Sequence, residues 1–130
     1  MSFSYAKKHE QTERIVSKLI KGLKKIFYRS IENKEISYKE LNEFIKNKGA
    51  LLIDVRSSQE YDEDHINGAI NIPLYNIKKE IEKIAKDKNQ IIILYCATGA
   101  RSKKAKTEIE KLGYENVYNL KGGIDSIWTK

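Results

Sequence analysis

The chain has 130 residues with 40% hydrophobic and 33% charged side chains, which fits one folded domain and argues against a disordered or fibrous chain. No apolar run approaches the roughly 20 residues that a membrane-spanning helix needs. The N-terminus has no apolar signal core followed by a cleavage site, so we expect a cytoplasmic location.

The net charge of +7 is concentrated in the first part of the chain. Residues 1–50 carry 12 Lys and Arg against 6 Asp and Glu, whereas residues 51–130 carry 13 against 12. Residues 15–31 show apolar side chains at helical spacing with lysines mostly on the other side, which predicts a basic amphipathic helix. We favour packing of this helix on its own domain, a protein partner or a second copy over contact with a membrane surface. Since the basic residues line one helix without an aromatic stacking platform, we expect no nucleic-acid partner.

The rest of the chain predicts alternating helices and strands. Ser37-Tyr-Lys-Glu40 has the pattern of a capping box and opens a helix to about Lys46, which Asn47-Lys-Gly49 ends. The further predicted elements follow in chain order: strand 51–55, a helical turn within 57–63, strand 69–72, a helix around 77–85, strand 90–95, helix 103–112, strand 117–120 and a short helix 124–128. The alternation predicts an α/β fold with a parallel sheet covered by helices on both faces.

The chain has a single cysteine, Cys96, which directly follows the predicted strand 90–95. One cysteine cannot form an internal disulfide, and its spacing from His9 and His65 does not make a metal site. Because ligands of parallel sheets bind at the carboxyl ends of the strands, Cys96 lies where a reactive group is expected.

The residues after Cys96 favour an anion-binding loop. Ala97, Gly99 and Ala100 are small enough for the backbone to curl tightly, so that successive amides turn inward and the next helix adds partial positive charge. Arg101 is predicted to close this ring with a fixed cation, and Ser102 to cap the helix. Such surroundings lower the pKa of a cysteine, and the thiolate is its nucleophilic form.

Over residues 37–130 the chain resembles the single-domain rhodanese-like sulfurtransferases, and residues 1–36 form an extension outside the resemblance. Three motifs carry it in the expected order: Leu52-Ile-Asp-Val-Arg56 with Glu60-Tyr61 and His65–Pro73, then Cys96-Ala-Thr-Gly-Ala-Arg-Ser102, then Gly113–Val117 with Leu120-Lys-Gly-Gly-Ile124. The resemblance implies a rhodanese-like parallel sheet flanked by helices on both faces, and the periodicity of residues 15–31 adds an N-terminal helical extension to the predicted fold.

The resemblance also implies a persulfide relay, in which Cys96 takes a sulfane sulfur from a donor and passes it to an acceptor such as cyanide or a thiol. No metal or cofactor is implied; the partners are small-molecule or protein donors and acceptors. The substrate would be bound by the loop residues Ala97, Thr98, Gly99, Ala100, Arg101 and Ser102. Asp54 and Arg56 would form a supporting ion pair that braces the loop region, and His65 would make a structural hydrogen bond.

Two residues depart from thiosulfate-using relatives. Ala97 stands where some of them carry a cation, and Glu60 stands where some carry arginine. The departures imply that thiosulfate is a poor donor and that a protein or low-molecular-weight persulfide is the natural one.

Two other functions remain open at this point. Cysteine phosphatases and arsenate reductases also use a Cys loop, but the phosphatase signature has one more residue than the four between Cys96 and Arg101. Alternatively, rhodanese-like domains can act as non-catalytic docking or regulatory modules, usually when the cysteine is lost.

Overall fold

The computed structural model describes residues 34–128. The predicted amphipathic helix at 15–31 lies outside the described residues. Within them, no helix is long and apolar enough to cross a membrane.

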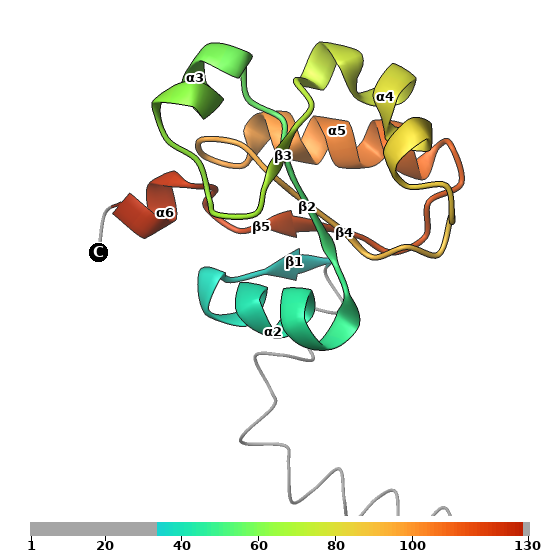
Figure 1. Cartoon of the computed structure of the whole chain (residues 1–130), viewed down its shortest axis with the longest axis horizontal. Coiled ribbons are helices and arrows are strands. Elements are labelled where there is room, and N and C mark those ends of the chain that lie inside the picture. The colour runs from blue at the N-terminus through green and yellow to red at the C-terminus, as the bar shows by residue number, and fades with distance from the viewer. Residues whose placement is uncertain (1–33, 129–130) are drawn as a thin grey trace, which may run out of the picture.

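A five-stranded parallel sheet forms the centre of the domain (Figure 1). Its strands are β1 (Glu35–Ile36), β2 (Leu51–Asp54), β3 (Ile70–Asn71), β4 (Ile92–Tyr95) and β5 (Val117–Leu120), in the spatial order β1-β5-β4-β2-β3. Every pairing is parallel, with Ile53 of β2 opposite Leu94 of β4 and Leu94 opposite Asn119 of β5. All strands therefore end at the same edge of the sheet, and the predicted fold class is confirmed.

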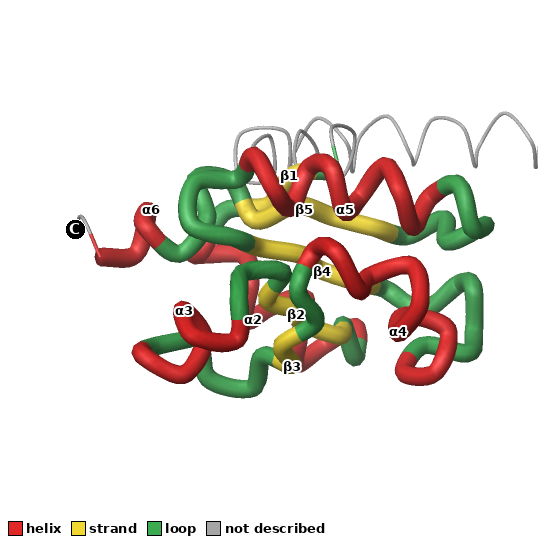
Figure 2. Tube along the Cα trace, turned by 90° about the horizontal axis from the view of Figure 1, so that it is seen from above, coloured by secondary structure: helices red, strands yellow, loops and turns green. Residues whose placement is uncertain are grey.

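Helices cover both faces of this sheet. They are α2 (Tyr38–Lys48), α3 (Ser58–Glu63), the 3-10 helix η1 (Leu74–Asn76), α4 (Ile77–Ile84), α5 (Ala100–Glu110) and α6 (Asp125–Trp128). Helices α4 and α5 lie side by side on one face and α2 lies on the other, as the two views show (Figures 1 and 2). Helix α3 and α6 lie toward the edge where the strands end (Figure 1).

The predicted start of α2 is confirmed in detail. Ser37 accepts a hydrogen bond from the amide of Glu40, and the Glu40 side chain accepts one from the amide of Ser37, so that both partners of the capping box are present. Gly49 ends the helix in the left-handed conformation, with φ of 62°, which glycine adopts without steric cost.

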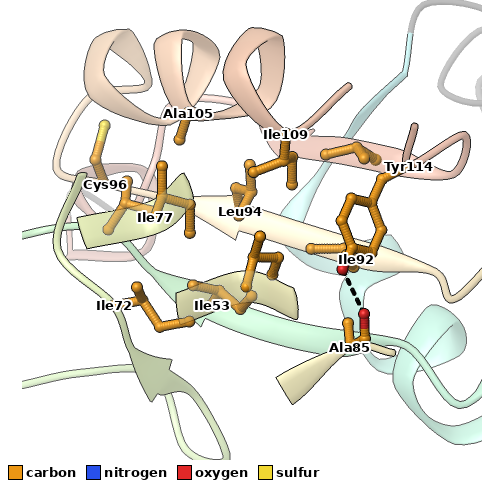
Figure 3. Packing of buried hydrophobic residues seen from close by; sticks show 13 residues of the cluster. Ile53, Ile72, Ile77, Ala85, Ile92, Leu94, Cys96, Ala105, Ile109 and Tyr114 are labelled. Carbon is orange, nitrogen blue, oxygen red and sulfur yellow. Dashed lines mark hydrogen bonds between the residues drawn. The ribbon is translucent and has the colours of Figure 1, made fainter. Parts of the chain in front are cut away.

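The core between the sheet and helices α4 and α5 is almost entirely aliphatic (Figure 3). Ile53, Ile92 and Leu94 from the sheet pack against Ile77 of α4 and Ile109 of α5, and all five are fully buried. Burial of one such side chain contributes about 1.5–3 kcal/mol relative to leaving it exposed. The hydroxyl of Tyr114 donates to the carbonyl of Ala85, which satisfies the polar atom at the end of this core (Figure 3).

Two elements differ from the sequence expectation. The sequence analysis placed Glu35 and Ile36 in the extension, but they form the edge strand β1 beside β5. A strand of two residues is too short to show a periodic pattern in the sequence. Helix α5 begins at Ala100 rather than Lys103, because Gly99 takes a φ of 114° and turns the chain directly into the helix.

Candidate active site

Cys96 lies where the sequence predicted, directly after β4 at the edge where the parallel strands end. Its side chain is 1% exposed and belongs to the same buried cluster as Val55 and Ala105. The chain then curls through residues 97–99 and enters α5, so that the sulfur lies at the beginning of this helix (Figure 3).

Three hydrogen-bonding groups surround the sulfur. The amide of Gly99 lies 3.1 Å from Sγ and the amide of Ser102 lies 3.4 Å from it, both as donors. The Ser102 hydroxyl also lies 3.4 Å from Sγ. The tight curl that directs these groups inward depends on Gly99, since its φ of 114° is one that side-chain-bearing residues rarely adopt.

These contacts favour the thiolate. Burial acts against ionisation of Cys96, but the Ser102 hydroxyl and the amides of Ser102, Gly99 and Thr98 together outweigh it and lower the pKa of the thiol. A thiolate is therefore available nearer to neutral pH than in a free cysteine, as the sequence predicted.

Ser102 is held by a residue that the sequence analysis missed. Its hydroxyl lies 2.5 Å from Oδ1 of Asn119 on β5 and 3.1 Å from the carbonyl oxygen of Gly99. Asn119 is 1% exposed in strand β5. A polar residue within a predicted buried strand was the feature of the sequence that could have marked it as part of the site. The prediction that Ser102 caps α5 is wrong: Gly99 occupies the cap position, and Ser102 lies in the first turn with its hydroxyl turned toward the sulfur.

Further amides of the loop remain available to an anion. The N–H groups of Ala97, Ala100 and Arg101 donate to no acceptor among residues 34–128. Free amides at the start of a helix attract negative charge. The loop can therefore stabilise an anionic group attached to Cys96 as well as the thiolate itself.

The third sequence motif holds the loop from behind. The amide of Ile124 donates to the carbonyl of Cys96 at 2.9 Å, and the amide of Asp125 donates to the carbonyl of Ala97 at 3.0 Å. Gly123 lies so close to the loop that a Cβ added to it would be 2.5 Å from the Cys96 carbonyl oxygen. Glycine is thus required at this position for the backbone to support the loop.

The sequence predicted that Arg101 closes the cysteine loop with its cation, but the guanidinium donates its hydrogen bonds elsewhere. Its guanidinium instead binds both carboxylate oxygens of Glu60 on α3, at 2.7 and 3.0 Å. This pairing lowers the pKa of Glu60 to about 2. It also raises the pKa of Arg101, and the negative charge of the nearby Cys96 thiolate makes a smaller contribution in the same direction. The carboxylate takes up the cation that the sequence assigned to the anion site.

Asp54 and Arg56 form the predicted ion pair at the end of β2. The Arg56 guanidinium donates to Asp54 at 2.8 Å and to the carbonyl of Asp64 at 2.6 Å, and both charged side chains are buried. Asn71 donates to the carbonyls of Asp54 and Arg56, which joins β3 to the same network. The network fixes the segments before and after α3, and neither charged group hydrogen-bonds to the cysteine sulfur.

His65 makes the structural hydrogen bond that the sequence predicted. Its Nδ1 lies 2.8 Å from the carbonyl oxygen of Tyr61, and its ring stacks on that of Tyr61 with centroids 3.7 Å apart. Over residues 34–128, no group of three or more His, Cys, Asp or Glu side chains is arranged to hold a metal ion.

The curated proteins similar to this chain include a thiosulfate sulfurtransferase and tRNA uridine(34) hydroxylases. The thiosulfate sulfurtransferase PspE of Escherichia coli is 41% identical over 75 residues, which cover 58% of this chain and 71% of that protein. A tRNA uridine(34) hydroxylase of Buchnera aphidicola is 37% identical over 93 residues, 68% of this chain. The chain spans only 30% of that hydroxylase and 25% of the one from Hamiltonella defensa.

Solved structures and the family model agree with this match. The structure described as rhodanese with anions from E. coli is 38% identical, has a TM-score of 0.55 and covers 58% of this chain and 88% of its own. A rhodanese-like domain protein from Staphylococcus aureus is 29% identical, with a TM-score of 0.62 and coverage of 70% and 87%. The model of the rhodanese-like domain matches residues 37–130. The chain therefore belongs to the rhodanese-like domain family.

Proposed function

We propose that this protein is a sulfurtransferase that carries a sulfane sulfur as a persulfide on Cys96. The observation that supports this most strongly is the sulfur of Cys96 surrounded by the Gly99 amide and by the amide and hydroxyl of Ser102. These donors lower the pKa of Cys96, and thiolate character is what nucleophilic attack on a sulfane sulfur requires.

The reaction has two displacement steps. The Cys96 thiolate attacks the outer sulfur of a donor, a bond forms between the two sulfurs, and the donor leaves with the electron pair, as sulfite if the donor is thiosulfate. Cyanide or a thiolate then attacks the outer sulfur of the Cys96 persulfide. The sulfur–sulfur bond breaks and its electron pair goes to the Cys96 sulfur, which regenerates the thiolate. Thiocyanate or a new persulfide is released.

The loop can stabilise the charge in both steps. A persulfide carries its negative charge on the outer sulfur, and the amides of Ala97, Ala100 and Arg101 have no other acceptor within the described residues. Because these donors are fixed by the backbone, they need no rearrangement when the charge moves from one sulfur to the next.

The Glu60 carboxylate favours a persulfide over thiosulfate as the donor. Thiosulfate is a dianion, and Glu60 binds the guanidinium of Arg101 with both oxygens. With that charge balanced and Ala97 in place of a cation, the loop offers mainly neutral amide donors. PspE is described as a thiosulfate sulfurtransferase, so both donor classes belong in the test.

Sulfur transfer also fits the loop better than phosphoryl transfer. Four residues separate Cys96 from Arg101, and the guanidinium is bound to Glu60 rather than left to hold a phosphoryl oxygen. The tRNA uridine(34) hydroxylases are much longer than the matched segment. The geometry of the cysteine loop in this chain supports a sulfur nucleophile.

The direct test is a sulfur-transfer assay on the full chain, with thiosulfate or a low-molecular-weight persulfide as donor and cyanide as acceptor. We expect thiocyanate to form, faster from the persulfide, and to be absent with Cys96→Ser. Thr107→Ala, which changes an exposed hydroxyl on α5, should leave the rate unchanged. Equal thiocyanate formation by the wild type and Cys96→Ser would contradict the proposed function.

A further inference from the structure

Asn119 lies behind the cysteine loop, at the far end of a chain of buried polar groups. It is on the same side of β5 as Val117, whose side chain packs in the core beneath α4 and α5. From there its Oδ1 lies 2.5 Å from the hydroxyl oxygen of Ser102, which in turn lies 3.4 Å from Sγ of Cys96. All three residues are buried. Asn119 is therefore linked to the nucleophile through the Ser102 hydroxyl.

The Ser102 hydroxyl has a single proton and several acceptors beside it. Besides Asn119 and the cysteine sulfur, the carbonyl oxygen of Gly99 lies 3.1 Å away. That carbonyl already accepts a hydrogen bond from the amide of Lys103 at 3.1 Å. The main choice for the hydroxyl proton is therefore between Asn119 and the sulfur.

The charge of the sulfur decides this choice. Beside a neutral sulfur, the hydroxyl donates to Oδ1 of Asn119. A thiolate is a stronger acceptor, because hydrogen bonds to an ionised group are stronger than those between neutral groups. The hydroxyl proton then turns to the sulfur, and the oxygens of Ser102 and Asn119 face each other without a proton between them. Two buried acceptors at that distance are unfavourable unless one of them is replaced by a donor.

The carboxamide of Asn119 can supply that donor. Its Oδ1 and Nδ2 are attached to the same carbon, and a half-turn about χ2 exchanges them. Within residues 34–128, Nδ2 donates to no acceptor, so the turn breaks no other hydrogen bond. Gly99, the residue beside Nδ2, carries no side chain that would restrict the turn.

We propose that Asn119 is a positioning residue that reverses this hydrogen-bond chain when Cys96 changes charge: it accepts from Ser102 beside a neutral sulfur and donates to Ser102 beside a thiolate. No proton is transferred along the chain, because only the hydroxyl and the carboxamide rotate. The inference rests on the proposed function for its place in the reaction. The Cys96 sulfur is a thiolate before it attacks the donor and neutral while it carries the outer sulfur, so the chain reverses twice in each cycle.

An NMR titration of the reduced full chain tests the reversal. The side-chain NH₂ signals of Asn119 should shift with pH at the same midpoint as the rate of Cys96 alkylation by iodoacetamide. In Ser102→Ala the thiolate still forms, but these signals should no longer follow it, because the link is removed. Signals that stay fixed in the wild type, or that shift equally in Ser102→Ala through the charge alone, would overturn the proposal.

The direction of a substitution effect provides a second test. Asn119→Leu should lower the rate of Cys96 alkylation at neutral pH on the order of fivefold, because the Ser102 hydroxyl loses the donor that supports it beside the thiolate. A residue that only accepts would compete with the sulfur for the hydroxyl proton, and its removal would speed alkylation. An unchanged or faster rate in Asn119→Leu therefore contradicts the proposal.

Two comparisons show whether Asn119 acts through Ser102. Adding Asn119→Leu to Ser102→Ala should slow alkylation no further, whereas an additional decrease would mean that Asn119 acts by another route. The matched control is Asn116→Leu, just before β5, where the side chain donates to the carbonyl of Asn89. Its alkylation rate should equal that of the wild type, and a decrease as large as in Asn119→Leu would remove the assignment to Asn119.

These measurements need no sulfur donor, which separates the inference from the proposed function. Sulfur transfer by a wild type whose Asn119 signals stay fixed would overturn the inference alone. Signals that follow Cys96 ionisation in a protein that transfers no sulfur would support the hydrogen-bond chain and refute the proposed function.

Discussion

The core beneath α4 and α5 and the edge where the parallel strands end differ in what they bury. The core beneath α4 and α5 consists of aliphatic side chains such as Ile53, Ile92 and Leu94. The buried polar and charged side chains of residues 34–128 are instead gathered at or near the edge where the strands end: Asp54, Arg56, Ser102 and Asn119. Every one of them hydrogen-bonds to a partner in that region.

This difference assigns different tasks to the two regions. Apolar burial is non-directional and stabilises the fold in proportion to the area removed from water. Buried polar groups cost free energy unless they are paired, and their pairing fixes direction. The aliphatic region therefore supports the stability of the domain, whereas the polar edge positions the segments around Cys96.

The largest loss of stability is expected at the polar edge. Arg56→Gln leaves the carboxylate of Asp54 buried without its ionic partner, which costs about 3–5 kcal/mol in such pairs. Urea unfolding followed by circular dichroism measures the free energy of unfolding. The double variant Asp54→Asn with Arg56→Gln should recover part of the loss, and a single variant as stable as the wild type would show that the pair does not brace this edge.

A comparable but purely apolar loss is expected in the aliphatic region. Ile92→Ala removes a fully buried side chain and should lower the free energy of unfolding by about 2–5 kcal/mol. The pKa of Cys96 should stay at its wild-type value, because no donor to the sulfur changes. Ile84→Ala, at a position that is 39% exposed, is the matched control with a smaller loss. A shifted Cys96 pKa in Ile92→Ala would mean that the two regions are not separable.

A change in chemistry rather than in stability is expected for Ser102→Ala. The Ser102 hydroxyl contributes to lowering the pKa of Cys96, so losing it should raise this pKa. The pH dependence of alkylation by iodoacetamide reports this pKa directly. Thr107→Ala on the same helix should leave the pH profile of alkylation unchanged. An unchanged profile in Ser102→Ala would show that the Ser102 hydroxyl does not stabilise the thiolate.

The smallest effect is expected for Glu60→Gln. The pKa of Glu60 is lowered from 4.5 to about 2 by Arg101, so the stability that the pair contributes is present above about pH 4.5 and is lost as the pH falls toward 2. The pair is partly exposed, and its contribution at neutral pH is at most about 1 kcal/mol. Unfolding measured from pH 6 to pH 3 should show a flatter pH dependence in Glu60→Gln. An identical dependence in both proteins would show that the pair contributes nothing.

Regular elements were predictable from the sequence because their signals are local. The apolar runs at 51–54, 92–95 and 117–120 are strands, and the capping box at Ser37 opens a helix where expected. The two-residue strand β1 was missed because it is recognised only through its pairing with β5.

Within the candidate site, the cysteine loop and the pair of Asp54 and Arg56 were predictable from motifs. The bond between Arg101 and Glu60 was missed because it joins residues 41 positions apart, and no local pattern specifies such a contact. Asn119 reaches Ser102 only once β5 lies beside β4. What the sequence could not provide is the set of partners that the sheet brings together.

The most direct test of the central claim is the intact mass of the reduced full chain after exposure to a low-molecular-weight persulfide, and separately to thiosulfate. We predict a gain of one sulfur atom, reversed by cyanide and absent in Cys96→Ser. A protein whose mass is unchanged by both donors, or one that gains sulfur equally in Cys96→Ser, would contradict the assignment of Cys96 as the sulfur carrier.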